Sequence, residues 1–315
     1  MRELQVGRND AKQRLDRFLN KVFPKATASF LQKMIRQKKI KVNKKRAEAN
    51  SLIKEGDRIQ IYLYEEVLLP LEEKRVRPKT TLHLSYAFQN EDFAVIDKPC
   101  GVLSHPANSA DYGKTVVDAL ISDLIASGEY VPRLEKSFVP ALINRLDMQT
   151  AGLLVGAKNH RAMLILQEAL KEGRIEKYYL AYVEGCVDQP DTVALPLITE
   201  NGMSRVDANG KACLTHYKPL LTRSRFSLLE IRLETGRTHQ IRAHMAAIGH
   251  PLIGDRAYGA QYRLQEFKHH LLLSHRLQFL NLEALALPER FNVYSEKTEQ
   301  FQSLSKQLER GKGWI

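Results

Sequence analysis

The segment INRLDMQTAGLLV, residues 143–155, places a cation and an anion directly before an apolar run. Strand alternation would put Leu146 on one face and Arg145 with Asp147 on the other. A carboxylate in that position must reach water or meet a partner. It is therefore either an exposed strand end or a carboxylate held in a cleft. The tripeptide Arg-Leu-Asp does not distinguish these two interpretations, since it recurs at residues 14–16 in a helical pattern.

A second polar cluster lies in ETGRTHQIRAHMAAIGHPLIGDRAYG, residues 234–259. It contains Arg237, His239, Gln240, Arg242 and His244. Such a segment is typical of a nucleic-acid-facing helix or of a catalytic loop. A metal site is disfavoured because the two histidines are five residues apart and do not share a helical face. The sequence also lacks the glycine fingerprints of nucleotide binding and a nucleophile elbow, so we predict no cofactor.

The candidate chemistry therefore depends on a carboxylate, arginines and an aromatic ring. An arginine fork can orient a carboxylate and keep it ionised, and Asp147 with Arg237 would be such a pair if the fold brings them together. Tyr179, in an alternating strand pattern, offers a flat face that suits stacking on an extruded base. The alternative is structural: an ion pair that only stabilises the fold, and a core tyrosine.

The elements that must position these residues begin at about residue 82. We predict strands at 93–97, 177–185 and 226–236. We also predict a helix at 160–173 that ends at Gly173. The predicted elements do not alternate regularly between strand and helix, as they would in a doubly wound sheet. The fold class is therefore α+β, with a mostly antiparallel mixed sheet in a catalytic domain at 82–315. Residues 65–81 contain clustered charges, Pro70 and Pro78, and are predicted to be a linker.

Residues 1–64 are predicted to form a small α+β domain. Helical patterns cover 11–23 and 28–39, and short strands follow at Val42 and at 59–63. Thr27 or Ser29 is the expected N-cap of the second helix. The domain has 17 basic and 6 acidic residues, a net charge of +11, whereas the rest of the chain has +1. A charge concentrated in this way indicates a polyanionic partner.

Eight basic residues within the fourteen from 33 to 46 are the candidate phosphate contacts. They are Lys33, Arg36, Lys38, Lys39, Lys41, Lys44, Lys45 and Arg46. A solvated helix face is the alternative, but a basic helix that leads into a turn suits phosphate binding. The unit resembles the alpha-L RNA-binding domain of ribosomal-protein type in RLDRFL at 14–19, IKVNKKR at 40–46 and EGDRIQI at 55–61.

The composition, 43% hydrophobic and 27% charged over 315 residues, is that of a soluble globular protein. No apolar run approaches the roughly 20 residues needed to span a bilayer, and the N-terminus lacks the apolar core of a secretory signal. The three cysteines, Cys100, Cys186 and Cys213, indicate a reducing compartment. We therefore expect a cytoplasmic protein that does not bind membranes.

Four separated motifs resemble the RluA-type pseudouridine synthases. In order they are DKPCGVLSHP, RLDMQTAGLL, EKYYLAYVEG, and ETGRTHQIRAHM with HPLIGDRAYG. The resemblance covers about residues 84–292, and many members of the family also have an N-terminal RNA-binding unit. It implies an isomerase that converts uridine in RNA to pseudouridine without a cofactor.

The resemblance also implies a role for each matching residue. Asp147 would be catalytic, Arg145 would help to open or hold the RNA, and Tyr179 would pack on the target base and take part in proton transfer. Lys177 begins the motif of Tyr179, and Arg237 would be the partner of Asp147. His239, Gln240, Ile241 and Arg242 complete the last motif. Asn144 and Ala151 depart from the His and Ser of many members, which could alter hydrogen bonding beside Asp147.

The implied reaction breaks the glycosidic bond, turns the uracil and rejoins it through carbon five. The target base must leave the stack to be reached. Asp147 would act on the sugar as nucleophile or as base. Large-subunit ribosomal RNA is the expected substrate and a monomer the expected state. The alternatives are a transfer-RNA pseudouridine synthase and a non-catalytic RNA-binding ribosome assembly factor.

Overall fold

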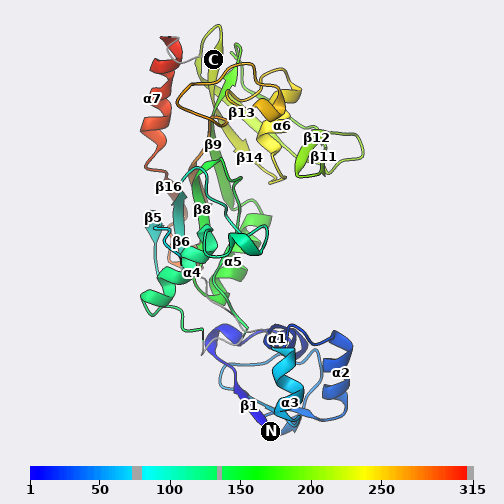
Figure 1. The fold of residues 1–315 in the computed structure, drawn as a ribbon. Helices are drawn as coiled ribbons and strands as arrows, with labels where there is room; N and C mark the ends of the chain where they lie inside the picture. Colours follow the sequence, from blue (N-terminus) through cyan, green and yellow to red (C-terminus); the bar gives the residue numbers. More distant parts are fainter. Residues whose placement is uncertain (73–79, 133–136, 311–315) are drawn as a thin grey trace.

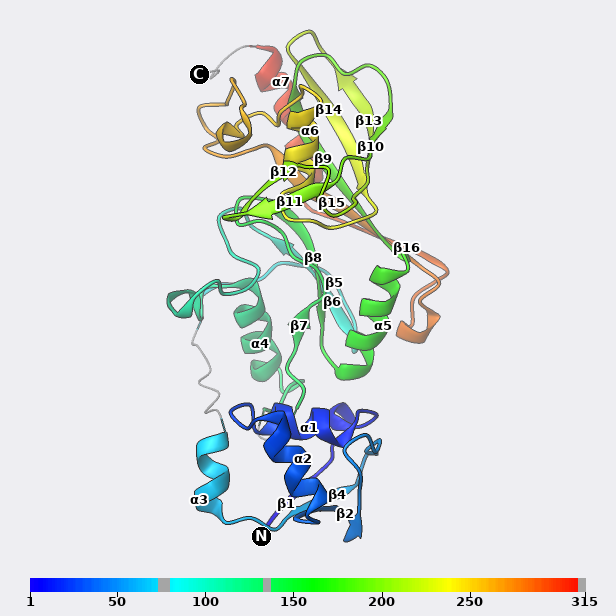
Figure 2. The same cartoon turned by 90° about the vertical axis from the view of Figure 1, so that its right-hand side faces the viewer.

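A computed structural model describes residues 1–72, 80–132 and 137–310 of the chain. These residues form two units that lie end to end, a small one that contains the N-terminus and a large one built on a long sheet (Figures 1 and 2). The α+β class is confirmed. Among the helices described, none has the length and apolar character needed to cross a membrane.

The small unit packs two helices on a four-stranded antiparallel sheet. Its elements are β1 (Arg2–Gln5), η1 (Arg8–Asp10), α1 (Leu15–Val22), α2 (Ala28–Arg36), β2 (Ile40–Val42), β3 (Lys45–Arg46) and β4 (Arg58–Ile61), with strand order β1-β4-β2-β3. Helix α1 starts later than predicted because Lys12 has a positive φ of 61°. Helix α2 begins at the predicted cap, where Thr27 accepts a 3.3 Å hydrogen bond from the Phe30 amide. It ends before Lys38, which also has a φ of 61°.

The segment predicted to be a linker begins with ordered structure. Helix α3 (Glu65–Leu68) and a 3-10 turn, η2 (Leu69–Leu71), follow the last strand of the small unit. Leu68 is buried in the hydrophobic core of that unit. The start of the predicted linker therefore packs with the small domain, because its apolar residues complete that core. Residues 73–79 lie outside the described part of the chain.

The two units are joined by buried polar contacts. Asp10 is fully buried, and one of its carboxylate oxygens accepts 2.6 Å hydrogen bonds from both the amide and the hydroxyl of Ser137. Gln13 also donates to the Ser137 hydroxyl at 2.7 Å. The small unit therefore docks on the large one through specific hydrogen bonds.

A ten-stranded mixed sheet forms the large unit, as predicted. Its strands are β5 (Tyr86–Gln89), β6 (Phe93–Lys98), β7 (Ala141–Leu142), β8 (Ala151–Ala157), β9 (Ile175–Glu184), β10 (Asp191–Val193), β13 (Thr215–Thr222), β14 (Phe226–Leu233), β15 (Leu272–Leu280) and β16 (Arg290–Tyr294). The main path runs β10-β13-β14-β9-β15-β8-β6-β5, and only β8 and β15 pair in parallel. A separate hairpin joins β11 (Leu197–Glu200) to β12 (Met203–Val206).

Helices cover both faces of this sheet (Figures 1 and 2). They are α4 (Val116–Ala126), α5 (His160–Lys171), α6 (Gln240–Ala247) and α7 (Thr298–Glu309), and 3-10 turns occur at Ser109–Asp111 (η3), Arg256–Tyr258 (η4) and Glu283–Leu285 (η5). Helix α5 ends near Gly173, as predicted, where φ is +74°. Alternate residues of β9 enter two different cores, with Tyr179 in one and Leu180 in the other.

Gly152 fixes how closely the strand after Asp147 approaches the middle of the sheet. Its φ is +108°, and a Cβ at this position would lie 2.1 Å from the Ser274 carbonyl oxygen. A side chain therefore cannot be accommodated where β8 meets β15. Because β15 also pairs with β9, this close approach holds the Asp147 loop beside Tyr179.

Candidate active site

Asp147 lies in a loop between β7 and β8, so the prediction of a strand at this position is wrong. The Thr150 amide donates a 3.1 Å hydrogen bond to the Asp147 carbonyl, which makes a turn instead of an extended ladder. The expected separation of side chains nevertheless occurs. Leu146 is buried, Arg145 is exposed, and Asp147 is half-buried at the wall of a pocket.

The backbone on both sides of Asp147 is held by side chains from other segments. The Ser104 hydroxyl donates to the Leu146 carbonyl at 2.8 Å and accepts from the Leu146 amide at 3.1 Å. The Lys98 ammonium donates to the Met148 carbonyl at 2.9 Å, and burial lowers the pKa of this lysine to about 8. These contacts preorganise the carboxylate.

Two nitrogen groups face the Asp147 carboxylate. His239 Nε2 lies 3.6 Å and Arg242 Nη1 lies 3.8 Å from its Oδ2 atom. Arg242 also donates two 2.7 Å hydrogen bonds, through Nε and Nη2, to the buried carboxylate of Asp255. Its guanidinium carbon lies 4.7 Å from the centre of the Tyr258 ring. The cation beside Asp147 is thus fixed by a bidentate pair and a cation–π contact.

His239 presents a defined nitrogen to Asp147. The Tyr258 hydroxyl accepts a 3.0 Å hydrogen bond from the Ser204 amide and lies 3.1 Å from His239 Nδ1. The Tyr258 hydroxyl can pair with Nδ1 in either tautomer, and Nε2 is the ring nitrogen that faces Asp147. Burial lowers the pKa of His239, while the charge of Asp147 acts in the opposite direction. Tyr258 thus orients the imidazole toward Asp147.

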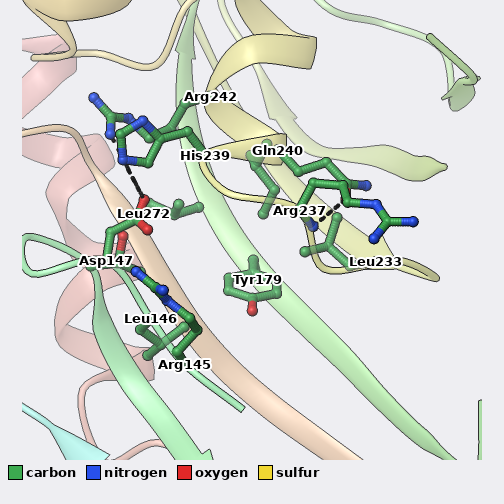
Figure 3. Close-up of a pocket in the computed structure, with 12 residues that line it drawn as sticks. Arg145, Leu146, Asp147, Tyr179, Leu233, Arg237, His239, Gln240, Arg242 and Leu272 are labelled. Atoms are coloured by element: carbon green, nitrogen blue, oxygen red, sulfur yellow. Dashed lines mark hydrogen bonds and ion pairs between the residues drawn. The ribbon is translucent and has the colours of Figure 1, made fainter. Parts of the chain in front are cut away.

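The predicted pairing of Asp147 with Arg237 is wrong. Arg237 is exposed, and its Nη2 atom lies 3.5 Å from the Ala212 carbonyl oxygen. Figure 3 shows its guanidinium and Asp147 on opposite sides of Tyr179. The Gln240 side chain accepts a 3.0 Å hydrogen bond from the Arg237 amide, which fixes the turn before α6. Arg237 and Arg242 both line the pocket, but of the two only Arg242 lies within 4 Å of the Asp147 carboxylate in the described part of the chain.

Tyr179 lines the pocket of about 370 Å³ in which Asp147 also lies. Only 5% of its surface is exposed, and Leu233 and Leu272 line the same cavity. Burial and then the charge of Asp147 raise the pKa of Tyr179 well above its usual range, while Ser274 partly opposes this. The hydroxyl is therefore a phenol at neutral pH, in a site with an apolar face and a polar rim.

Gln240 is not available to RNA, contrary to our prediction. Its side chain donates to the Leu214 carbonyl and the Thr215 hydroxyl, both at 3.0 Å. It accepts from the Arg237 amide and the Thr235 hydroxyl. All four hydrogen-bonding positions of the amide are occupied within the protein, so this residue positions the loop.

Two further sequence candidates are internal. His244 is fully buried and contacts the Thr215 hydroxyl at 2.9 Å and the Leu195 carbonyl at 2.8 Å. Lys177 is buried beside Gly236 and does not line the pocket of Tyr179, and burial lowers its pKa. The structure therefore places His244 and Lys177 in the surrounding framework. The predicted residues that it brings together around one pocket are Arg145, Asp147, Tyr179, Arg237, His239, Gln240 and Arg242.

Both departures from the family pattern are accommodated locally. The side-chain oxygen of Asn144 accepts a 2.8 Å hydrogen bond from the Val155 amide and so ties the loop to β8. Ala151 begins β8 and pairs with Leu273 of β15. Neither replacement disturbs the contacts of Asp147 with His239 and Arg242.

The basic cluster of the small unit lies on its surface. Seven of the eight side chains are exposed, and Lys41, the partly buried one, lies 5.1 Å from the centre of the Tyr62 ring. Within the described part of the chain, no member of the cluster forms an ion pair with a carboxylate. Their charge is therefore available to an anionic ligand.

Sequence reasoning missed four residues that support the site: Lys98, Ser104, Asp255 and Tyr258. The first two occur in DKPCGVLSHP and the last two in HPLIGDRAYG. Each motif places charged or hydroxyl groups inside an apolar stretch, and this pattern could have indicated buried polar residues that support the site. The contacts themselves join residues that are 13 to 50 positions apart, so spacing alone did not reveal them.

Comparisons with known proteins show what the chain is similar to. Residues 92–247 match the RNA pseudouridylate synthase family model, and residues 13–59 match the S4 domain model. An uncharacterized RNA pseudouridine synthase of Aquifex aeolicus is 35% identical, over 78% of this chain and 77% of the relative. The ribosomal large subunit pseudouridine synthase D of Nitrosomonas europaea is 34% identical, over 82% and 72%.

A third relative and one solved structure extend the comparison. The ribosomal large subunit pseudouridine synthase C of Buchnera aphidicola is 31% identical, over 81% of this chain and 80% of the relative. The structure titled human RNA Pseudouridylate Synthase Domain Containing 4 superposes with a TM-score of 0.55 at 21% identity, over 70% of this chain and 92% of that one. The structural likeness concerns the fold.

Proposed function

Because the chain belongs to the RluA-type RNA pseudouridylate synthase family, with an N-terminal S4 domain, we propose that this RNA uridine isomerase acts on large-subunit ribosomal RNA. Relatives named ribosomal large subunit pseudouridine synthase C and D support this substrate. Both kinds match at similar identity, so their names do not single out one uridine.

The pocket of Tyr179 supports binding of an extruded uracil. A base flipped from the RNA would enter between the Tyr179 ring and the apolar side chains of Leu233 and Leu272. Arg145 is exposed at the pocket wall, where it would hold the opened strand. This arrangement excludes water from the base while it is detached from the sugar.

Asp147 is the group placed to act on the ribose, as nucleophile or as base. The Arg242 guanidinium compensates its charge, and the His239 ring faces the same oxygen with Nε2 at 3.6 Å. Both neighbours are fixed before substrate arrives, by Asp255 and Tyr258. Preorganised donors of this kind stabilise charge that changes during the reaction without further rearrangement.

The high pKa of Tyr179 restricts its part in proton transfer. A neutral phenol can accept the proton from carbon five only as its own proton leaves. The proton that the phenol releases is balanced by the uracil nitrogen that left the sugar, because that nitrogen gains one proton in the product while carbon five loses one. We therefore propose that Tyr179 first supports the base by stacking and then relays the proton, so that the reaction needs no exogenous acid or base.

The surface charge of the S4 domain supports capture of RNA. Its exposed basic cluster would contact phosphates and raise the local concentration of substrate at the pocket. We also propose the division into an RNA-binding domain at 1–64, a linker at 65–81 whose first residues pack on that domain, and a catalytic domain at 82–315. The three free cysteines fit a monomer that works in the cytoplasm.

One observation carries the proposal: an aspartate, flanked by an arginine and a histidine, shares a pocket with a buried tyrosine in a chain that has a basic RNA-binding domain. The test is pseudouridine mapping on unmodified ribosomal and transfer RNA, with the wild type and Asp147→Asn side by side. We expect new pseudouridine in large-subunit RNA with the wild type only, and nearly unchanged RNA binding by the variant.

The other outcomes are distinguishable. Product in transfer RNA alone would replace the proposed substrate by transfer RNA. Tight, salt-sensitive binding without product on either RNA or on assembling particles would indicate an assembly factor. Turnover by Asp147→Asn equal to that of the wild type would remove Asp147 from the catalytic role.

A further inference from the structure

A second cavity adjoins the pocket of Tyr179. Asp147, His239 and Arg242 line both cavities and so form the wall between them. The second cavity has a volume of about 670 Å³, larger than the first. Its other walls come from residues 254–257 and 268–270, together with Met148 and Gln149. The proposed reaction with the uracil uses only the first cavity.

The second cavity carries more positive than negative charge, with Arg242, Arg256 and Lys268 against Asp147 and Asp255. Arg256 and Lys268 line it and are exposed, and within the described part of the chain neither forms an ion pair. The Asp255 carboxylate in the same wall is already engaged by Arg242. His270 adds no charge at neutral pH, because burial and the charge of Arg242 lower its pKa to about 4. The available charge therefore comes from one arginine and one lysine.

The two segments that carry these cations are fixed against each other. Gly254 has a φ of +85°, and a Cβ there would lie 2.5 Å from the His269 carbonyl oxygen. The Gly254 amide donates a 2.8 Å hydrogen bond to the Tyr262 carbonyl. At the floor, His270 Nε2 lies 3.0 Å from the Thr150 hydroxyl, in the loop of Asp147. Backbone packing thus places Arg256 and Lys268 at a set position relative to the catalytic carboxylate.

We propose that the second cavity binds the sugar-phosphate backbone of the nucleotide that adjoins the flipped uridine. This inference rests on the proposed function, because it takes the uracil to occupy the pocket of Tyr179 and the ribose to lie at Asp147. From that position the RNA strand must leave across the shared wall. Arg256 and Lys268 then meet the next phosphate, and the cavity has room for part of its nucleotide. Phosphate contacts of this kind fix the register of the strand without reading its sequence.

The test uses the full-length chain with both cations removed, Arg256→Ala with Lys268→Ala. The matched control is Lys171→Ala with Arg290→Ala, two exposed cations on α5 and β16 that also form no ion pair in the described residues. The substrate is a transcript of large-subunit ribosomal RNA, shortened around the mapped uridine. Circular dichroism of all proteins checks that they are folded.

We expect the Arg256 and Lys268 variant to raise KM about tenfold with kcat nearly unchanged, since it removes binding that the ground and transition states share. The dependence of log Kd on log salt should become shallower by roughly 0.7 per lost phosphate contact, the slope for single strands. The control should match the wild type. Equal KM and equal salt slopes for the two double variants would overturn the proposal.

A nested set of RNAs locates the contact. Nucleotides are removed one at a time from each side of the target uridine. At one specific step the difference in KM between variant and wild type should disappear. A difference that survives removal of the flanking nucleotides on both sides would show that the cations act without local contact, which also overturns the proposal. Failure of the proposed function is a separate result, because the wild type would then form no pseudouridine.

Discussion

Arg242 meets Asp147 with one edge of its guanidinium while the opposite edge is held by Asp255. Nη1 lies 3.8 Å from Asp147 Oδ2, and Nε and Nη2 donate 2.7 Å hydrogen bonds to Asp255. Asp255 is 2% exposed, so this pair is protected from solvent. The Asp147 carboxylate thus has a cation whose orientation is set by a second, buried carboxylate.

Arg242→Lys should lower turnover by about 10²- to 10³-fold, as expected when one preorganised electrostatic group is lost. A lysine cannot bind Asp255 in bidentate fashion and still reach Asp147. The comparison variant is Arg237→Lys, whose exposed side chain lines the same pocket but forms no ion pair with Asp147 in the described residues. The single-turnover rate at saturating RNA is measured for the Arg242→Lys and Arg237→Lys variants and compared with that of the wild type. A greater loss for Arg237→Lys would restore the pairing that the sequence pattern predicted.

Asp255→Asn should destabilise the protein by about 3 kcal/mol, because it leaves a buried guanidinium without its counter-ion. Turnover should fall as well, since Arg242 is no longer held in place. Urea unfolding followed by circular dichroism measures the first effect. Asp207→Asn, which removes an exposed ion pair with Arg205, is the control and should change stability little. Similar unfolding midpoints for the two variants would argue against a structural role of Asp255.

Tyr179→Phe should keep RNA binding and stability while turnover falls by about 10²- to 10⁴-fold, the range for loss of a group in proton transfer. The ring that stacks is retained, and only the hydroxyl is removed. Tyr179→Leu is the comparison, and it should weaken binding of the target RNA in addition. The prediction fails if Tyr179→Phe isomerises uridine at the wild-type rate.

His270 should make the stability depend on pH in the mildly acidic range. Burial first, and the charge of Arg242 second, lower its pKa from 6.5 to about 4. The unfolded chain therefore binds a proton at a higher pH than the folded chain. The stabilising contribution is complete above pH 6.5 and is lost as the pH falls toward 4, with a total of about 3 kcal/mol.

His270→Gln tests this assignment. Glutamine can still reach the Thr150 hydroxyl but does not titrate. Between pH 7 and pH 4 the free energy of unfolding of the wild type should fall about 3 kcal/mol further than that of the variant. Parallel curves over this range would show that His270 does not contribute to the pH dependence.

Lys44→Ala with Lys45→Ala should weaken RNA binding and reduce the slope of log Kd against log salt by roughly 0.7 for each lost contact. Both side chains are exposed, Lys44 in the turn before β3 and Lys45 at the start of that strand, so the fold should be unaffected. Point variants are preferable to deletion of residues 1–64, because Asp10 and Gln13 are bonded to Ser137 of the large unit. An unchanged salt slope would exclude this turn as a phosphate contact.

The sequence by itself determined the elements with clear periodicity and the placement of charge. Strands β6, β9 and β14 and helix α5 follow from alternation, helical spacing and Gly173, since these are local properties of the chain. The basic cluster could be read directly, because solvated charges need no tertiary partner. The motifs around Asp147 and Tyr179 identified the family, and the comparisons confirm it.

Tertiary structure decided which side chains meet. Arg237 and Arg242 are five residues apart in one motif, and only the turn held by Gln240 determines that the second faces Asp147. The loop at Asp147 resembled a strand in sequence because Leu146 alternates with charged residues. It bends because the backbone of Leu146 is bonded by Ser104, 42 positions away. Contacts of such long separation are set by packing of the whole sheet, which no local pattern encodes.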